Sequence, residues 1–125
     1  MIQHIKLYGT TNSSGALTVT STVRVEGLLQ AVEWIDGTFA DGVDAVLSVD
    51  RNDNAADVTL LTLTDANSDA MYYPQTPAQD NVGTAVTYDG TNEIYTRQIV
   101  NGLLKLVVSD GGDTKVGGCI VYVES

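Results

Sequence analysis

Short apolar runs, many of them alternating with polar residues, make up most of the sequence, and Gly, Asn and Asp separate one run from the next. A two-residue period places alternate side chains on opposite faces of an extended strand, and the turn residues recur at roughly ten-residue spacing. The runs that predict strands span residues 2–8, 16–21, 23–35, 43–49, 58–64, 82–87, 93–100, 103–109 and 118–124. This pattern predicts an all-β antiparallel sandwich, and about eight strands suit a jelly roll.

Two glycines refine this prediction. Gly27 interrupts the longest apolar run and predicts a bulge or a bend between two halves of a strand. Within that run, residues 28–34 are the only place where a helical turn could compete. Asn101-Gly102 stands between two apolar runs, which is a strong local signal for a hairpin. The sequence therefore predicts that the chain reverses direction at residues 101–102.

The length and composition fit one globular domain over residues 1–125. Hydrophobic residues make up 43% of the chain and charged residues 18%, which is the composition of a folded rather than a disordered protein. We find no internal repeat and no change in composition that would mark a linker. The N-terminal segment lacks the pattern of a secretion signal, so we expect synthesis in the cytoplasm without export.

The charge of the chain bears on its partners. Sixteen acidic residues against six basic ones give a net charge of −10. Phosphate groups are bound by basic surfaces, so this charge counts against a nucleic-acid partner and against an anionic membrane surface. No apolar run approaches the roughly 18 residues that a membrane-spanning helix needs. The sequence thus predicts no nucleic acid and no membrane among the partners.

Few residues could support catalysis. His4 is the only histidine, so a Ser-His or Cys-His pair would have to use it. Cys119 lies among apolar residues and is expected to be a buried, inert thiol. The twelve aspartates are scattered through turns, where their side chains commonly bond to the local backbone. We therefore predict no catalytic residues and no enzyme activity.

Two acidic loops contain candidate calcium ligands. In the first, Asp50, Asn52 and Asn54 have the 1-3-5 spacing of a helical calcium loop. However, Ala55 stands where that loop needs glycine, and Leu61 stands where it needs a bidentate acid. The second arrangement is built from Asp36, Asp41 and Asp44. For these three a solvated acidic loop is favoured over calcium binding, so the sequence predicts no metal and no cofactor.

Aromatic residues offer contact surfaces. A sugar-binding platform could use Trp34, Phe39, Tyr72, Tyr73, Tyr88 and Tyr95. Trp34 follows an apolar run and is expected to cap the core instead. Adjacent tyrosines in a strand point to opposite faces, so at least one side chain of Tyr72-Tyr73-Pro74 could face outward and contact a protein, or it could pack under a loop. Phe39 lies between two Asp-Gly pairs, where it could contact a partner or fold back onto the sandwich.

Taken along nearly its whole length, the chain resembles small structural proteins of tailed phages, and among them the jelly-roll decoration (cement) proteins of capsids. The segments that carry the resemblance are residues 31–34 (AVEW), 39–44 (FADGVD), 61–67 (LTLTDAN), 72–75 (YYPQ), 104–112 (LKLVVSDGG) and 117–123 (GGCIVYV). These are strand and turn patterns rather than chemical signatures. The resemblance implies a non-enzymatic virion protein, a dimer or trimer that binds the major capsid protein on the capsid exterior and clamps the shell.

On that reading we expect three contact surfaces. The first is the strand at residues 2–8 with Ile2, His4 and Tyr8, the second is Tyr72, Tyr73 and Pro74, and the third is the loop at residues 36–44 with Phe39 near its centre. The alternatives are another virion component (neck, tail or head fibre), a carbohydrate-binding or adhesion module, and a small β-sandwich enzyme, which the single histidine nearly excludes.

Overall fold

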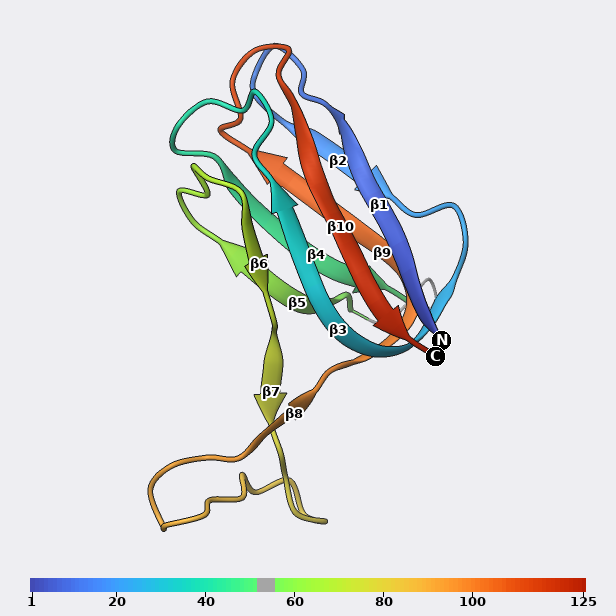
Figure 1. Ribbon diagram of the computed structural model, residues 1–125, viewed down its shortest axis with the longest axis vertical. Helices are drawn as coiled ribbons and strands as arrows, with labels where there is room; N and C mark the ends of the chain where they lie inside the picture. Colours follow the sequence, from blue (N-terminus) through green and yellow to red (C-terminus); the bar gives the residue numbers. More distant parts are fainter. Residues whose placement is uncertain (52–55) are drawn as a thin grey trace.

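The computed structural model describes residues 1–51 and 56–125, and Figure 1 shows that its described part is built from strands and connecting loops. The strands are β1 (Ile2–Thr10), β2 (Leu17–Thr20), β3 (Val25–Ile35), β4 (Asp44–Asp50), β5 (Val58–Leu63), β6 (Ala70–Tyr72), β7 (Gln75–Pro77), β8 (Tyr95–Arg97), β9 (Ile99–Ser109) and β10 (Val116–Glu124). The all-β prediction is thus confirmed. Asn52, Asn54 and Ala55, which bore on the calcium-loop comparison, lie outside the described residues.

Eight of the strands form two antiparallel layers. One layer has the order β1-β10-β3-β6 and the other β2-β9-β4-β5, and the layers join at one corner where the first half of β3 pairs with the first half of β9. The pairs are nested: β1 with β10, β2 with β9, β3 with β6, and β4 with β5. This arrangement is compatible with the predicted β-sandwich, and the jelly roll stays a prediction.

The core lies between these two layers. Alternating residues of each strand point inward, and the largest fully buried side chains include Trp34, Leu7, Leu29, Leu47, Leu104 and Leu106. The Trp34 indole Nε1 donates a hydrogen bond to the Ala66 carbonyl oxygen (2.9 Å), so its one polar group is satisfied inside the core. Trp34 therefore takes the core position that the sequence predicts for it.

The predicted hairpin turn at Asn101-Gly102 is wrong. β9 continues through both residues, and Gly102 has φ +152° rather than the geometry of a tight turn. A Cβ atom there would lie 2.6 Å from the Asp50 carbonyl oxygen, so glycine is needed for close approach of two strands. Gly27 pairs with Val100 of β9 and lies where β3 leaves β9 and begins to pair with β10. The change of partner after Gly27 agrees with the predicted division of this strand into two halves, whereas the register shift of β3 against β10 falls between Leu29 and Ala31. Residues 28–34 are strand rather than helix.

Residues 73–98, which we call the arm, leave the sandwich between β6 and β9. Figure 1 shows the arm projecting from one end of the two layers, with β7 and β8 paired as a narrow ribbon near its root. The strand predicted at residues 82–87 is wrong, because only isolated bridges occur at Ala85 and Thr87. Both prolines of the chain lie in or beside β7, where they limit further strand pairing.

The two ends of the chain lie side by side, at the end of the sandwich opposite the loops that follow β1 and β9 (Figure 1). The Met1 amino group donates to the Ser125 carbonyl oxygen (3.1 Å), and the Ser125 amide donates to the Met1 carbonyl oxygen (3.0 Å). These bonds extend the β1–β10 ladder by one more pair. In the described part of the chain, no helix has the length and apolar character to cross a membrane.

Candidate functional site

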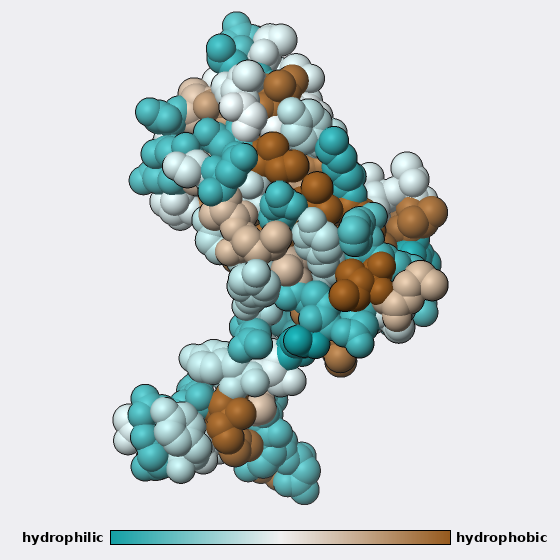
Figure 2. Space-filling model, in the orientation of Figure 1, coloured by the Kyte–Doolittle hydropathy of each residue, from teal (hydrophilic) through white to brown (hydrophobic). Residues whose placement is uncertain are grey.

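The first candidate surface is the solvent-facing side of the β1-β10-β3-β6 layer, which we call the outer sheet face. Strand register brings its residues together in rows, because directly paired residues share a face. The rows are Ile2–Glu124–Leu28, His4–Tyr122–Ala31, Lys6–Ile120–Glu33–Met71 and Tyr8–Gly118–Ile35. Figure 2 shows hydrophobic and hydrophilic residues interleaved over this side of the sandwich. The predicted set Ile2, His4 and Tyr8 is therefore confirmed as lying exposed on one face.

Side chains on this face support one another. The His4 ring meets the Tyr122 ring edge-on with centroids 4.8 Å apart, and the Tyr122 hydroxyl donates to Glu33 Oε1 (2.9 Å). This bond to a carboxylate raises the pKa of the Tyr122 hydroxyl above its ordinary value. The Lys6 ammonium lies 4.8 Å from the centre of the Tyr8 ring, a cation–π distance. The outer sheet face is thus a patterned surface of apolar and aromatic groups carried on a paired sheet.

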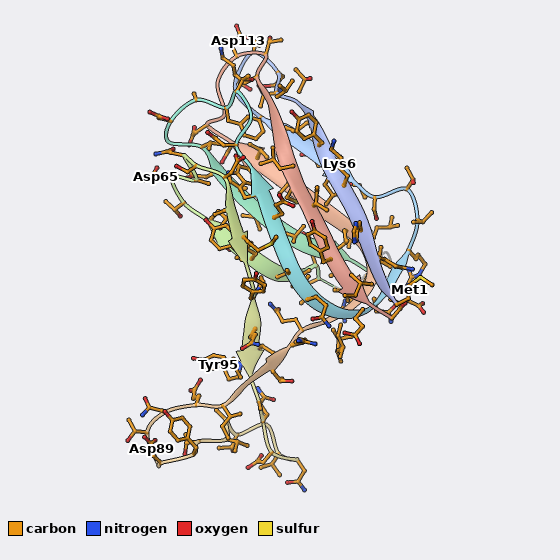
Figure 3. All side chains as sticks on the ribbon, in the orientation of Figure 1. Met1, Lys6, Asp65, Asp89, Tyr95 and Asp113 are labelled. Carbon is orange, nitrogen blue, oxygen red and sulfur yellow. The ribbon has the colours of Figure 1, made fainter. Side chains whose placement is uncertain are left out.

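The second candidate surface is the arm. Within residues 73–98, all of which the structure describes, no side chain is buried. Its exposed apolar side chains are Tyr73, Val82, Tyr88, Ile94 and Tyr95. Figure 3 labels Tyr95 near the root and Asp89 near the tip, far from the core. Sequence reasoning missed this projection, although the loss of regular alternation and the two prolines in this stretch were a signal for it.

The turns at the arm tip, which we define as residues 78–94, are held by two aspartates. Asp80 Oδ1 accepts the Val82 and Thr84 amides (2.9 and 3.0 Å), and these bonds lower the pKa of the Asp80 carboxyl. Asp89 accepts the Asn92 amide (2.6 Å) and the Thr91 amide, which lower its pKa in the same way. Both aspartates therefore give the tip a defined shape at neutral pH.

The tyrosine pair at the start of the arm splits as alternation requires. Tyr72 ends β6, is half-buried and packs against the core, whereas Tyr73 is exposed. Pro74 is half-buried beside them. Tyr72 thus packs against the core with one part of its side chain, whereas Tyr73 is largely exposed. That the two tyrosines and Pro74 form a contact surface stays a prediction.

Phe39 is not a surface residue, so its predicted role at the centre of the third contact surface is wrong. It is buried and stacks on Trp34 with ring centroids 5.6 Å apart and planes inclined by 27°. Of the two alternatives for this loop, folding back onto the sandwich holds. Because Trp34 and Phe39 are both enclosed, neither can line a sugar-binding platform; of the six aromatic candidates, only Tyr73, Tyr88 and Tyr95 are exposed.

The acidic loops at the opposite end from the arm use their carboxylates for local structure. Asp44 Oδ1 accepts the Asp65 amide (3.0 Å), and Asp69 Oδ1 accepts the Asp36 amide (2.8 Å). Partial burial, with the charges of Asp69 and Asp41, raises the pKa of the Asp36 carboxyl. Among the described residues, no group of three or more His, Cys, Asp or Glu side chains is arranged to hold a metal ion.

Cys119 gives a direct test of the core. Burial raises the pKa of its thiol to about 12. We expect a maleimide reagent to leave Cys119 unmodified in the folded protein and to label it fully in denaturant. The thiol of the unfolded chain ionises near pH 9, so the stability that comes from keeping Cys119 protonated is fully present below that pH. As the pH rises from there toward 12, the unfolded chain loses this proton first and the free energy of unfolding falls. Cys119→Ala should remove this pH dependence. Rapid labelling of the folded protein at neutral pH would contradict this packing.

A cleft of about 530 Å³ lies where the arm joins the sandwich, and we call it the root cleft. Val49, Val58 and Ile99 form its apolar part, and Thr76, Thr96 and Arg97 of the arm form the other wall. Arg51 also lines it. Arg97 Nη1 lies 3.8 Å from Glu124 Oε2, an exposed ion pair. The cleft thus joins residues of the arm to residues of the core strands.

The comparisons with known proteins assign no family to this chain. No protein-family model and no curated protein matches it. Among solved structures, the crystal structure of FlhE is similar at 14% sequence identity and a TM-score of 0.40, with 99% of this chain and 98% of that chain covered. A TM-score below 0.5 does not establish a shared fold, so we draw nothing from this likeness. The resemblance to phage decoration proteins stays a prediction.

Proposed function

We propose that this chain is a non-enzymatic structural protein of a phage particle, a decoration protein that binds the capsid exterior through its outer sheet face. The observation that carries the proposal is this face itself: exposed Ile2, Tyr8 and Met71 share it with aromatic Tyr122 on a hydrogen-bonded sheet. Apolar and aromatic groups on a rigid element suit protein contact, because little conformational entropy is lost on binding. The sequence resemblance described above supplies the capsid as the partner.

Clamping a shell needs only modest affinity from each contact. A protein that binds the assembled shell, and not its dissociated subunits, stabilises the shell by mass action. When one copy contacts several capsid subunits, the combined affinity exceeds that of any single contact. The net charge of −10 fits a position outside the shell, away from packaged nucleic acid.

The location is tested by counting copies in purified particles from the source of the sequence, using quantitative mass spectrometry against the most abundant shell protein. We expect a copy number equal to that protein's or a simple fraction of it. A handful of copies would place the chain in the neck, tail or a head fibre. Its absence from particles would overturn the virion proposal and favour the carbohydrate-binding alternative.

The surface is tested with matched single substitutions. We expect Tyr8→Ser to weaken binding to the shell about tenfold or more, as the loss of an aromatic side chain from an interface commonly does. Val107→Ser is the control, because Val107 is exposed to nearly the same extent (37% against 39%) but lies in β9 of the other layer. Shell binding is measured by co-sedimentation with stripped particles. Equal binding of both variants and the parent protein would show that the outer sheet face is not the contact.

A further inference from the structure

The chain exposes more surface than a compact protein of its size. A 13.2 kDa monomer is expected to expose roughly 6,400 Å², whereas this chain exposes 7031 Å². The excess of roughly 600 Å² is close to the 800 Å² or so that one partner contributes to a standard protein interface. The arm contributes to this excess exposed area, because no side chain of residues 73–98 is buried.

The arm tip has a defined backbone and carries large exposed hydrophobic side chains. Val82 is 79% exposed and Tyr88 is 70% exposed, although turns held by Asp80 and Asp89 fix their backbone. The Ala78 amide donates to the Ile94 carbonyl oxygen (2.8 Å) and ties the two sides of the tip together. A preorganised segment with large exposed apolar side chains binds without a large ordering cost.

The root cleft has the chemistry that complements this tip. The tip carries Asp80, Asp89 and Glu93, and residues 78–94 contain no lysine or arginine. The cleft carries Arg51 and Arg97, two of the six basic residues of the chain, beside the apolar side chains of Val49, Val58 and Ile99. Arg51 Nη2 donates to the Ala56 carbonyl oxygen (3.1 Å), whereas its buried Nε has no acceptor among the residues that the structure describes. An acidic segment with apolar side chains therefore matches both features of the cleft.

We propose that the arm tip of one copy docks in the root cleft of a second copy of this chain. The tip cannot fill its own cleft, because the arm root forms one wall of the cleft and the tip projects away from the sandwich (Figure 1). Since every copy presents both a tip and a cleft, a symmetric pair makes this contact twice. The inference concerns the purified chain and does not depend on the proposed function.

Sedimentation equilibrium of the purified full-length chain tests the contact. We expect concentration-dependent association that weakens with added salt, because charged groups take part. The arm variant Val82→Ser/Tyr88→Ser and the cleft variant Arg97→Glu should each weaken association about tenfold or more. The controls are Val23→Ser, at a site 63% exposed in the β2–β3 loop, and Lys115→Glu at an exposed site before β10; both should associate as the parent chain does.

A mixture of the two variants distinguishes docking in the cleft from contact between arms. The arm variant keeps an intact cleft and the cleft variant keeps an intact tip, so a mixed pair retains one of the two contacts. We expect the mixture to associate more strongly than either variant alone and less strongly than the parent chain. A monomeric parent chain at all concentrations, unchanged association of the arm variant, or a mixture no better than its components would each overturn the proposal.

Discussion

Replacing Trp34 by alanine should lower the free energy of unfolding by about 4 kcal/mol, the typical cost of truncating a buried tryptophan. The indole is fully buried in the core between the two layers, and Phe39 stacks on it. Truncation leaves a cavity, removes the stacking partner of Phe39 and deprives the Ala66 carbonyl oxygen of its buried donor. A loss of this size is a large part of the roughly 5–15 kcal/mol that stabilises a domain, so the variant should unfold at much lower urea concentration.

Trp34→Phe separates packing from hydrogen bonding at this site. It keeps an aromatic ring against Phe39 but removes the Nε1 donor, so we expect a loss of about 1–3 kcal/mol from the unpaired Ala66 carbonyl group together with a smaller cavity term. Trp34 is the only tryptophan, and unfolding must therefore be followed by far-ultraviolet circular dichroism rather than by its fluorescence. A cost below about 1 kcal/mol for Trp34→Ala would contradict this account of the core.

The sandwich could be predicted from sequence because its strands carry a repeating physical pattern. In β1 and β10, one set of alternate residues faces the core and the other faces solvent, so the two-residue period shows directly in the chain. The same pattern placed Ile2, His4 and Tyr8 on a single exposed face. The burial of Trp34 followed from its position at the end of an apolar run.

Other features depend on contacts between distant segments and leave no local pattern. Asn101-Gly102 has the residue types of a hairpin turn, but Gly102 is needed because the Asp50 backbone approaches it closely. Phe39 looks misplaced between two turns until the loop folds over Trp34. The arm gains no stability from a core of its own. The two-residue period of apolar residues is absent from such a segment, so the sequence predicts only irregular chain there. The proposed role of its acidic tip depends on the arginines of the root cleft, which are brought together by the fold.

Gly27→Ala should be strongly destabilising although it adds only a single carbon, with an expected loss of about 3 kcal/mol. Gly27 has φ +148°. A Cβ atom there would collide with the Glu124 carbonyl oxygen and would lie 2.8 Å from the Glu124 carbonyl carbon. The end of β10 would have to move away from β3, which also disturbs the Arg97–Glu124 ion pair. Urea unfolding measures the loss.

Gly90→Ala is the matched control, because it also adds a Cβ at a positive φ (+82°) but no atom lies within 4 Å of that position. It carries the backbone strain alone, about 1 kcal/mol, and it does so in the arm. The difference between the two variants therefore measures how firmly the end of β10 is held against β3. If Gly27→Ala costs no more than Gly90→Ala, the end of β10 yields freely, and the close approach of these strands is not what fixes the corner where the two layers join.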